Sequence, residues 1–282
     1  MLNPDQIRLV ATDLDGTLLR EDTWVSERNA AALNRLRSAG VECVAATGRS
    51  HPSAIPRLAP LGTIRWLIAS NGATLYDLEA DQVVERYMLR AAVVYEIVSA
   101  IDAELGYSGY SWETVDGLAW DDHYIELRTK WGLPKSIDVG QATARFTPGT
   151  DDLAKIMVVN RDAQGRELAD RIRPLLGDEF NVASSGALFM EITAARANKA
   201  YMLSDLCERL DVDRAHTMAF GDQDNDAKML AWVAHGFAME NGDPILRAAI
   251  GRTAPHHERD GVAQVIERFW PDWPPTPPSA ET

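Results

Sequence analysis

The sequence is poor in cysteine and in basic residues. Its 282 residues include two cysteines, Cys43 and Cys207, which are too few for a disulfide framework. A chain of this kind is expected in the reducing cytosol. Asp and Glu together number 42 against 28 Lys and Arg, which gives a formal net charge of −14. This negative excess argues against binding to nucleic acid or to an anionic membrane surface, although a bound metal would still permit a small anionic substrate.

The sequence also lacks long apolar runs and periodic repeats. No stretch approaches the roughly 20 apolar residues that a helix needs to cross a bilayer, so no membrane span is expected. Residues 1–6 lack a basic segment followed by an apolar one, and no signal peptide is expected. Proline is concentrated in residues 271–282, for which we expect an extended, disordered tail. The composition favours no particular oligomeric state.

Strand and helix patterns alternate at both ends of the chain, in which 46% of all residues are hydrophobic. The expected strands cover residues 7–12, 41–46, 66–69, 215–220 and 236–239. A helix is expected from Ser26 to Gly40, and a last amphipathic helix carries Val262, Val265, Ile266 and Phe269. Such alternation implies right-handed crossovers between parallel strands. The predicted fold class is therefore α/β, with a Rossmann-like parallel-sheet core.

The middle of the chain has a different pattern. A helical stretch through Val93, Ile97, Ile101 and Leu105 precedes a strand at residues 155–159 and another helical stretch. Several aromatic residues, which we interpret mainly as core, gather here as well: Trp112, Trp120, Tyr124 and Trp131. We therefore predict a smaller α+β domain inserted at residues 86–189, within an α/β core made of residues 1–85 and 190–270.

Small polar and acidic residues follow four of the expected core strands. These four segments are Asp13-Leu14-Asp15-Gly16-Thr17, Thr47-Gly48-Arg49, Ser70-Asn71-Gly72 and Gly221-Asp222-Gln223-Asp224-Asn225-Asp226. Each segment alone is typical of a turn or a helix cap. The carboxyl ends of parallel strands meet at one rim of a sheet, where open α/β folds bind ligands. The combination of all four in this order indicates a binding site at that rim.

The acidic residues of these segments point to a metal ion. Asp13, Asp15, Asp222 and Asp226 would repel one another in a confined site unless a proton or a cation offset their charge. Mg²⁺ suits carboxylates, a backbone carbonyl and water as ligands. An acidic cluster that holds Mg²⁺ in turn favours a phosphate-bearing substrate.

The same segments resemble a known family. Asp13-Leu14-Asp15-Gly16-Thr17-Leu18, Thr47-Gly48-Arg49, Lys199 and Gly221 to Asp226 resemble the four motifs of the haloacid dehalogenase superfamily. Asn71-Gly72-Ala73 and Asp260-Gly261-Val262-Ala263 are similar to its Cof-type branch, in which a large α/β cap of type IIB follows the third strand. The resemblance implies a Mg²⁺-dependent phosphatase that acts on a small phosphorylated metabolite. Met239-Glu240-Asn241-Gly242 departs from the small-residue turn that is usual in this family.

The resemblance implies a role for each motif residue. Asp13 would attack phosphorus, and Asp15 would protonate the leaving group and then activate water. Thr47 would bind the transferring phosphoryl group, and Lys199 would hold Asp13. Metal binding is implied for Asp13, for the backbone carbonyl of Asp15 and for Asp222, with Asn225 and Asp226 orienting this shell. Substrate contacts are implied for Gly48, Arg49 and Asn71.

Several alternatives remain open at this point. Arg49 either contacts the substrate phosphate or pairs with a core carboxylate, and Asn71 either lines the pocket or closes a turn. Lys199 could also be a helix-surface lysine, and His256 and His257 are expected to be solvated. A phosphomutase on the same scaffold is the main alternative activity. A receiver-like signalling domain, which also forms a phosphoaspartate, is disfavoured because it would leave Asp15 without a role.

Overall fold

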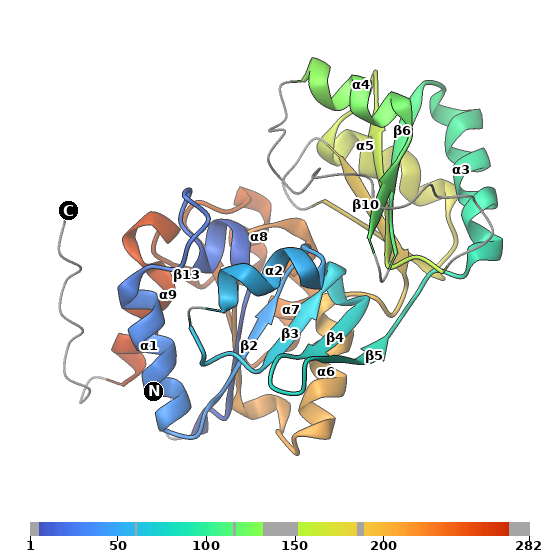
Figure 1. The fold of residues 1–282 in the computed structure, drawn as a ribbon. Coiled ribbons are helices and arrows are strands. Elements are labelled where there is room, and N and C mark those ends of the chain that lie inside the picture. The colour runs from blue at the N-terminus through green and yellow to red at the C-terminus, as the bar shows by residue number, and fades with distance from the viewer. Residues whose placement is uncertain (1–5, 60, 115–116, 132–151, 185–188, 271–282) are drawn as a thin grey trace. The chain divides into compact units, whose positions relative to one another are not determined.

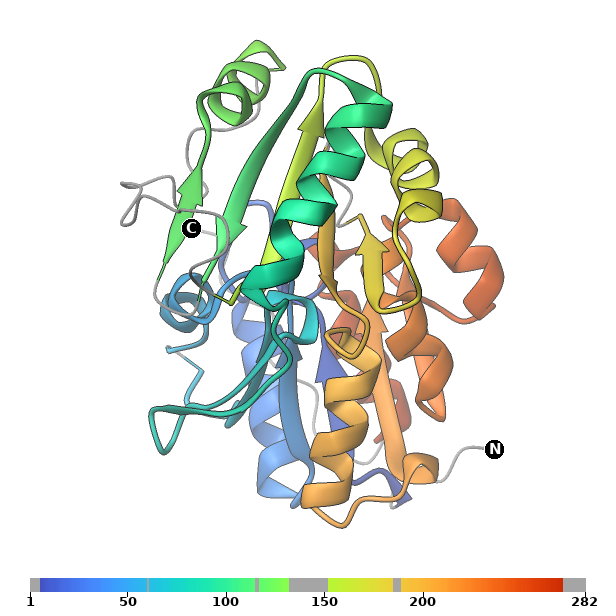
Figure 2. The same ribbon diagram turned by 90° about the vertical axis from the view of Figure 1, so that its right-hand side faces the viewer.

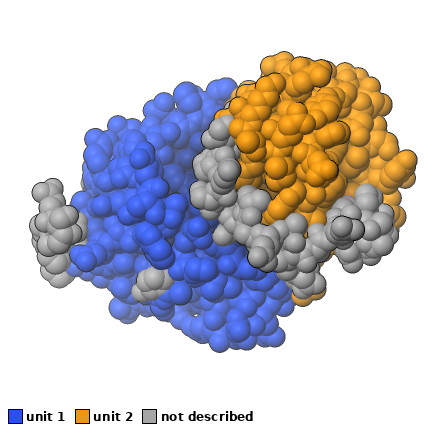
Figure 3. All heavy atoms as spheres, turned by 45° about the horizontal axis from the view of Figure 1, so that its top comes forward, with its two compact units in different colours: residues 1–85, 199–282 blue, residues 86–198 orange. Residues whose placement is uncertain are grey.

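The chain forms two compact units in a computed structural model that describes residues 6–59, 61–114, 117–131, 152–184 and 189–270. The first unit comprises Met1–Glu85 and Lys199–Thr282, and the second comprises Arg86–Asn198 (Figure 3). Residues 271–282, for which the sequence predicts a disordered tail, lie outside the described residues. In the part of the chain that is described, no helix is both long enough and apolar enough to cross a membrane.

The first unit is built on an eight-stranded sheet with the order β13-β12-β11-β1-β2-β3-β4-β5. Its strands are β1 (Leu9–Thr12), β2 (Glu42–Ala46), β3 (Trp66–Ala69), β4 (Thr74–Asp77), β5 (Gln82–Arg86), β11 (Thr217–Gly221), β12 (His235–Met239) and β13 (Thr253–Ala254). Neighbouring strands from β13 to β3 are parallel. The predicted α/β class with a parallel-sheet core is thereby confirmed.

Helices cover both faces of this sheet (Figures 1 and 2). They are α1 (Glu27–Ser38), α2 (His51–Leu58), α6 (Lys199–Arg209), α7 (Ala227–Trp232), α8 (Pro244–Ile250) and α9 (Gly261–Phe269). The hydroxyl of Ser26 caps α1 by accepting the Asn29 N–H at 3.1 Å. Leu33 and Leu36 of α1 and Val262 and Ile266 of α9 are buried in one hydrophobic core with the strands. Burial of these faces fixes both helices against the sheet.

The sheet differs from the expectation at one edge, where β4 runs antiparallel to β3. The chain reverses there through Ser70, Asn71 and Gly72, whose φ angles of 51°, 58° and 97° are all positive. Glycine adopts this backbone region without strain, whereas Ser and Asn adopt it less readily. The Asn71-Gly72 segment therefore both closes a turn and lies at the carboxyl end of β3.

The second unit has a five-stranded antiparallel sheet with the order β7-β6-β8-β10-β9. Its elements are α3 (Ala91–Leu105), β6 (Ser108–Glu113), β7 (Leu118–Trp120), α4 (Asp122–Lys130), β8 (Lys155–Asn160), α5 (Gly165–Ile172), β9 (Phe180–Ala183) and β10 (Met190–Ala194). The sequence assigned residues from 190 onward to the core. Strand β10 instead pairs with β8 and β9, so the chain returns to the first unit only at Lys199.

Candidate active site

Asp13 lies directly after β1, in the middle of the parallel sheet. Its backbone N–H donates to the Phe220 carbonyl of β11 at 2.9 Å, which continues the strand pairing by one residue. The side chain is buried, with 5% of the residue exposed. Buried strands on both sides thus fix the position of this carboxylate.

Lys199 connects Asp13 to the loop that follows β11. It is the first residue of α6, and no part of its side chain is exposed. Its Nζ lies 2.6 Å from Asp13 Oδ1 and 2.6 Å from Asp226 Oδ1. Burial lowers the pKa of this amine, but the two carboxylates more than offset that effect and raise it. The structure therefore excludes the alternative that Lys199 is a surface lysine.

Asp222 and Asp226 complete an acidic cluster with Asp13. One carboxylate oxygen from each residue lies within 4.8 Å of the other two, and all three residues are buried. Asp226 Oδ2 also accepts the backbone N–H groups of Asp222 and Gln223, at 2.9 and 3.1 Å. These bonds hold the loop in a fixed conformation around the cluster. The structure thus places the Asp226 carboxylate within the acidic cluster itself, whereas the family resemblance implied only an orienting role for it.

The cluster carries more negative charge than Lys199 balances. Burial, followed by the charge of Asp226, raises the pKa of Asp222 to about 7. Burial also raises the pKa of Asp13 well above its usual range, with contributions from Asp226, Asp222 and Asp15, although Lys199 opposes the shift. Three buried carboxylates close to a single ammonium favour a bound cation. Their hard oxygen atoms fit Mg²⁺.

The carboxylate of Asp15 lies apart from this cluster and is bound by Arg49. The Arg49 Nε donates to Asp15 Oδ2 at 2.6 Å, and Nη2 donates to Oδ1 at 2.5 Å. The Asp15 side chain is 50% exposed, whereas that of Arg49 is 8% exposed. A bidentate pair of this kind fixes the orientation of the carboxylate. Two roles were left open for Arg49, and the structure shows one of them, the ion pair with a carboxylate of the core, that of Asp15.

Asp15 lies in a compact turn, Leu14–Leu18. The backbone N–H of Leu19 closes the turn by donating a hydrogen bond to the Leu14 carbonyl at 2.8 Å. Within the turn Gly16 has a φ of +75°, and a Cβ added there would collide with Asp222 Oδ2. Only glycine permits this close approach between the two motifs.

The remaining predicted residues lie at the ends of the neighbouring strands. Thr47 follows β2, is buried, and accepts the Arg49 N–H through its Oγ1 at 3.1 Å. Gly48 lies between them and is half-buried. Asn225 donates its side-chain N–H to Asn71 Oδ1 at 3.0 Å, which links the ends of β11 and β3.

Some residues at the site were not identified as functional from the sequence. Thr17 Oγ1 and Gln223 Nε2 lie 3.4 and 3.1 Å from the two oxygens of Asp222. His257, which we expected to be solvated, is 8% exposed, and its Nδ1 lies 2.9 Å from the Leu19 carbonyl. The expectation was wrong because the loop before α9 packs against the segment after Asp15. Among the described residues, neither His256 nor His257 joins a group that could hold a metal.

Comparisons with known proteins agree with this geometry. A family model described as haloacid dehalogenase-like hydrolase matches residues 10–266. HMP-PP phosphatase of Escherichia coli (strain 55989 / EAEC) is 29% identical over 97% of this chain and 99% of its own. The relative named 5-amino-6-(5-phospho-D-ribitylamino)uracil phosphatase YitU, from Bacillus subtilis (strain 168), is 26% identical over 93% of this chain and 97% of its own.

Solved structures of the same fold cover both units. A haloacid dehalogenase-like hydrolase from B. subtilis superposes with a TM-score of 0.77 at 23% identity, covering 93% of this chain and 99% of that one. The HAD subclass IIB sugar phosphatase BT4131 superposes with a TM-score of 0.78 at 17% identity, over 93% and 99% of the two chains. With a family model that spans most of its length and with this fold, the chain belongs to the haloacid dehalogenase-like hydrolases.

Proposed function

We propose that this protein is a Mg²⁺-dependent phosphatase that hydrolyses a small phosphate monoester through a phosphoaspartate on Asp13. The observation that carries the proposal is the position of Asp13, at the end of a central strand, 2.6 Å from Lys199 and within an acidic cluster. A carboxylate is a competent phosphoryl acceptor when it is correctly placed. The relatives of this chain that are named as phosphatases support the same class of reaction, phosphate-ester hydrolysis.

The residues that would hold Mg²⁺ are Asp13 and Asp222, with the Asp15 backbone carbonyl and with Asp226 in support. When bound, the ion would offset negative charge on the phosphoryl oxygens and on the clustered carboxylates. A positive charge here favours the ionised form of Asp13, whose pKa is raised in the metal-free site. The nucleophile requires that ionised form.

In the first step, a carboxylate oxygen of Asp13 attacks phosphorus and the bond from phosphorus to the ester oxygen breaks. Protonated Asp15 gives its proton to the departing oxygen, which leaves as an alcohol. Thr47 accepts the Arg49 N–H and keeps its own hydroxyl proton to donate to a phosphoryl oxygen. Lys199 holds Asp13 in place through its hydrogen bond to Oδ1.

In the second step, ionised Asp15 removes a proton from a water molecule, which attacks the phosphoaspartate. The bond between phosphorus and the Asp13 oxygen breaks, inorganic phosphate leaves, and both carboxylates return to their starting states. In the structure both oxygens of Asp15 accept N–H groups of Arg49. Each of these oxygens has a second lone pair, so Asp15 can carry and deliver a proton while it remains paired with Arg49.

We further propose that the second unit is the cap that selects the substrate. Its antiparallel sheet and helices form a separate core, so its surface can change without disturbing the catalytic strands. Relatives are named for different small phosphorylated metabolites, which fits a shared reaction with a substrate preference that varies from one protein to another. A cytosolic location fits the two cysteines, which are buried and unpaired.

A phosphate-release assay across a panel of small organophosphates, with Mg²⁺ present, tests the proposal directly. We expect inorganic phosphate from at least one class of monoester, and no turnover in excess EDTA. A phosphomutase would isomerise its substrate and release little phosphate. A receiver-like domain would turn over none of them. Full turnover in excess EDTA would contradict the metal requirement.

Asp222→Asn should make the metal-free protein more stable and remove most of its response to Mg²⁺. The variant keeps the size of the side chain but deletes one buried carboxylate, whose pKa is about 7 in the cluster. Near pH 8 in EDTA we expect a gain of roughly 1–3 kcal/mol in unfolding free energy. Mg²⁺ should raise the Tm of the wild type, because it binds only the folded state.

The control for this experiment is Asp77→Asn. Asp77 is also buried, but it pairs with Arg65 outside the cluster, so its loss should lower the Tm and leave the Mg²⁺ response intact. Thermal unfolding of the three proteins with EDTA and with Mg²⁺ gives the comparison. Equal Mg²⁺-induced shifts in wild type and Asp222→Asn would rule out Asp222 as a ligand.

A further inference from the structure

The segment Gly16–Arg20, which follows Asp15, is held at four of its five residues, three times by side chains from the C-terminal part of the chain and once by a side chain of α1. Side chains bind the backbone carbonyls of Gly16, Leu18 and Leu19, and an ion pair holds Arg20. The four side chains that make these contacts are Asn29, Asn241, His257 and Asp260, and together they are called the brace here. The reaction proposed above assigns none of them a role.

Two asparagines in the brace make the same double bridge. Asn241 donates its side-chain N–H to the Gly16 carbonyl at 2.7 Å and accepts the His257 backbone N–H at 3.0 Å. Asn29 donates to the Leu18 carbonyl at 3.1 Å and accepts the Ala263 backbone N–H at 3.0 Å. Each amide therefore joins one carbonyl of the segment to one N–H of the chain between 257 and 263. Such bridges use both the donor and the acceptor of an amide.

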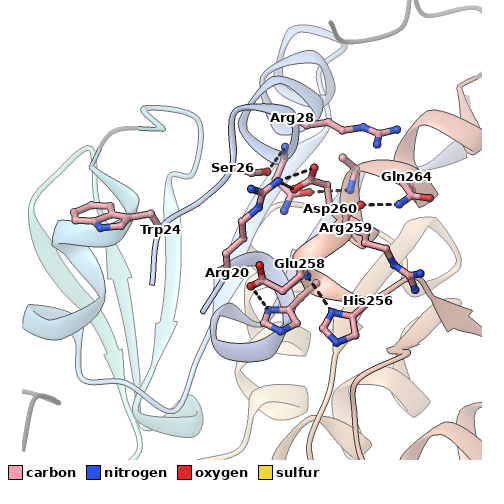
Figure 4. A network of polar contacts seen from close by, with 12 residues as sticks. Arg20, Trp24, Ser26, Arg28, His256, Glu258, Arg259, Asp260 and Gln264 are labelled. Atoms are coloured by element: carbon pink, nitrogen blue, oxygen red, sulfur yellow. Dashed lines mark hydrogen bonds and ion pairs between the residues drawn. The ribbon is translucent and has the colours of Figure 1, made fainter. Parts of the chain in front are cut away.

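The other two members hold the next residues of the segment. His257 Nδ1 lies 2.9 Å from the Leu19 carbonyl, so this nitrogen carries the proton that it donates. Asp260 accepts two hydrogen bonds from Arg20 Nη2, at 2.9 and 3.1 Å. Figure 4 shows Arg20 and Asp260 facing each other beside the loop that carries His256, Glu258 and Arg259. Glu258 adds a bond of 2.6 Å from the Glu21 backbone N–H.

This arrangement matters for Asp15 because the backbone, together with Arg49, sets where its carboxylate lies. Half of the Asp15 side chain is exposed, and Arg49 orients its carboxylate through two hydrogen bonds. The position of its carboxylate therefore depends on the backbone of the Leu14–Leu18 turn. Gly16, the next residue, approaches Asp222 too closely for any Cβ, so the turn lies directly beside the acidic cluster.

We propose that Asn241, together with the rest of the brace, positions Asp15 for proton transfer to the leaving group. This inference rests on the proposed function, because it assigns Asn241 a task within that reaction. Proton transfer requires a heavy-atom distance within hydrogen-bond reach. A misplacement of about 1 Å can reduce a rate by roughly 10²-fold. Loss of the bond to Gly16 should therefore impair the acid–base step before it impairs phosphoryl binding.

Asn241→Ala tests the inference with two substrates, an alkyl phosphate and an activated aryl phosphate. The alkyl ester needs a proton on its leaving group, and its kcat/KM should fall by roughly 10- to 10²-fold. The aryl ester needs little protonation and should change much less. In the Asp15→Ala background, Asn241→Ala should reduce neither residual rate further, because the group that it positions is gone.

Asp243→Ala is the matched control. Asp243 lies in the same loop and its side chain accepts the Ile245 N–H at 2.7 Å, which caps α8. This variant also loses side-chain hydrogen bonding in the loop, but the ratio of alkyl to aryl rates should stay at the wild-type value. Asn241→Asp provides a second variant, since it keeps an acceptor for His257 and replaces the donor to Gly16 by a charged carboxylate oxygen, which cannot donate to a carbonyl. It should reproduce the selectivity change of Asn241→Ala.

The possible outcomes separate the two proposals. Wild-type protein that releases phosphate from neither ester would overturn the proposed function and this inference with it. An active wild type whose rates depend on Asp15, combined with an unchanged alkyl-to-aryl ratio in Asn241→Ala and Asn241→Asp, would overturn the brace alone. Equal losses on both esters, or losses that add to those of Asp15→Ala, would likewise show a merely structural role.

Discussion

Replacing Asp13 by Asn is expected to abolish turnover while the protein remains folded. The amide is a far weaker nucleophile than a carboxylate, and no phosphoaspartate can form on it. Removal of a covalent nucleophile typically costs on the order of 10⁴- to 10⁶-fold in kcat. Asn also removes one charge from a buried cluster that contains a single ammonium, so the metal-free variant should be at least as stable as the wild type.

Steady-state phosphate release and acid-quench labelling with a ³²P-substrate measure this effect. The wild type should yield an acid-stable phosphoenzyme, and Asp13→Asn should yield none. Asp77→Asn serves as a control because it replaces another buried carboxylate that is held by a cation. Its kcat should remain near the wild-type value. A wild-type kcat in Asp13→Asn would exclude the phosphoaspartate mechanism.

The positions of the core strand ends could be predicted from the sequence because two local signals coincide there. A short apolar run predicts each buried strand, and the glycines and carboxylates after it mark the rim. In the structure Asp13 and Asp222 do lie together, at the ends of adjacent strands β1 and β11. Parallel pairing alone brings them close, so no detail of side-chain packing was needed for that prediction.

The brace could not be predicted in the same way, because its contacts join distant parts of the chain. Asn29 occupies a helix position and Asn241 a turn position, where asparagine is ordinary. Asn29 reaches Leu18 from α1 and Asn241 reaches Gly16 from the loop after β12, while the loop before α9 and α9 itself supply the N–H groups that the two amides accept. The local signals were the departure from a small-residue turn at Met239–Gly242 and the family motif that begins at Asp260, and neither indicated a partner.

The boundary of the second unit shows a related limit. Met190–Ala194 is a short strand in which apolar and polar residues alternate, and its length suits either unit. Its assignment is decided by its partners, since Ile192 pairs with Ile156 of β8 and with Val182 of β9. A local sequence pattern reveals the two-residue period of a strand. It does not reveal which distant strands pair with it.

Replacing Asp15 by Ala is expected to separate the two steps of the reaction. An alkyl ester would have to leave without a proton, so its rate should fall by roughly 10²- to 10⁴-fold. An activated aryl ester needs less help and should still phosphorylate Asp13. The second step lacks its base in this variant, so phosphoenzyme should accumulate with the aryl substrate. Arg49 would also lose its partner in this variant, but its charge would remain beside the site.

Rapid-quench labelling beside steady-state rates on both esters distinguishes this role from others. Asp22→Ala is a suitable control, because Asp22 is an exposed carboxylate in the segment after the Leu14–Leu18 turn and bonds only locally, to the Trp24 N–H at 3.0 Å. That variant should leave both rates and the labelling unchanged. Equal losses on the two esters without trapped phosphoenzyme would mean that Asp15 supports the metal site only. The exposed position of its carboxylate, outside the cluster of Asp13, Asp222 and Asp226, favours the acid–base role instead.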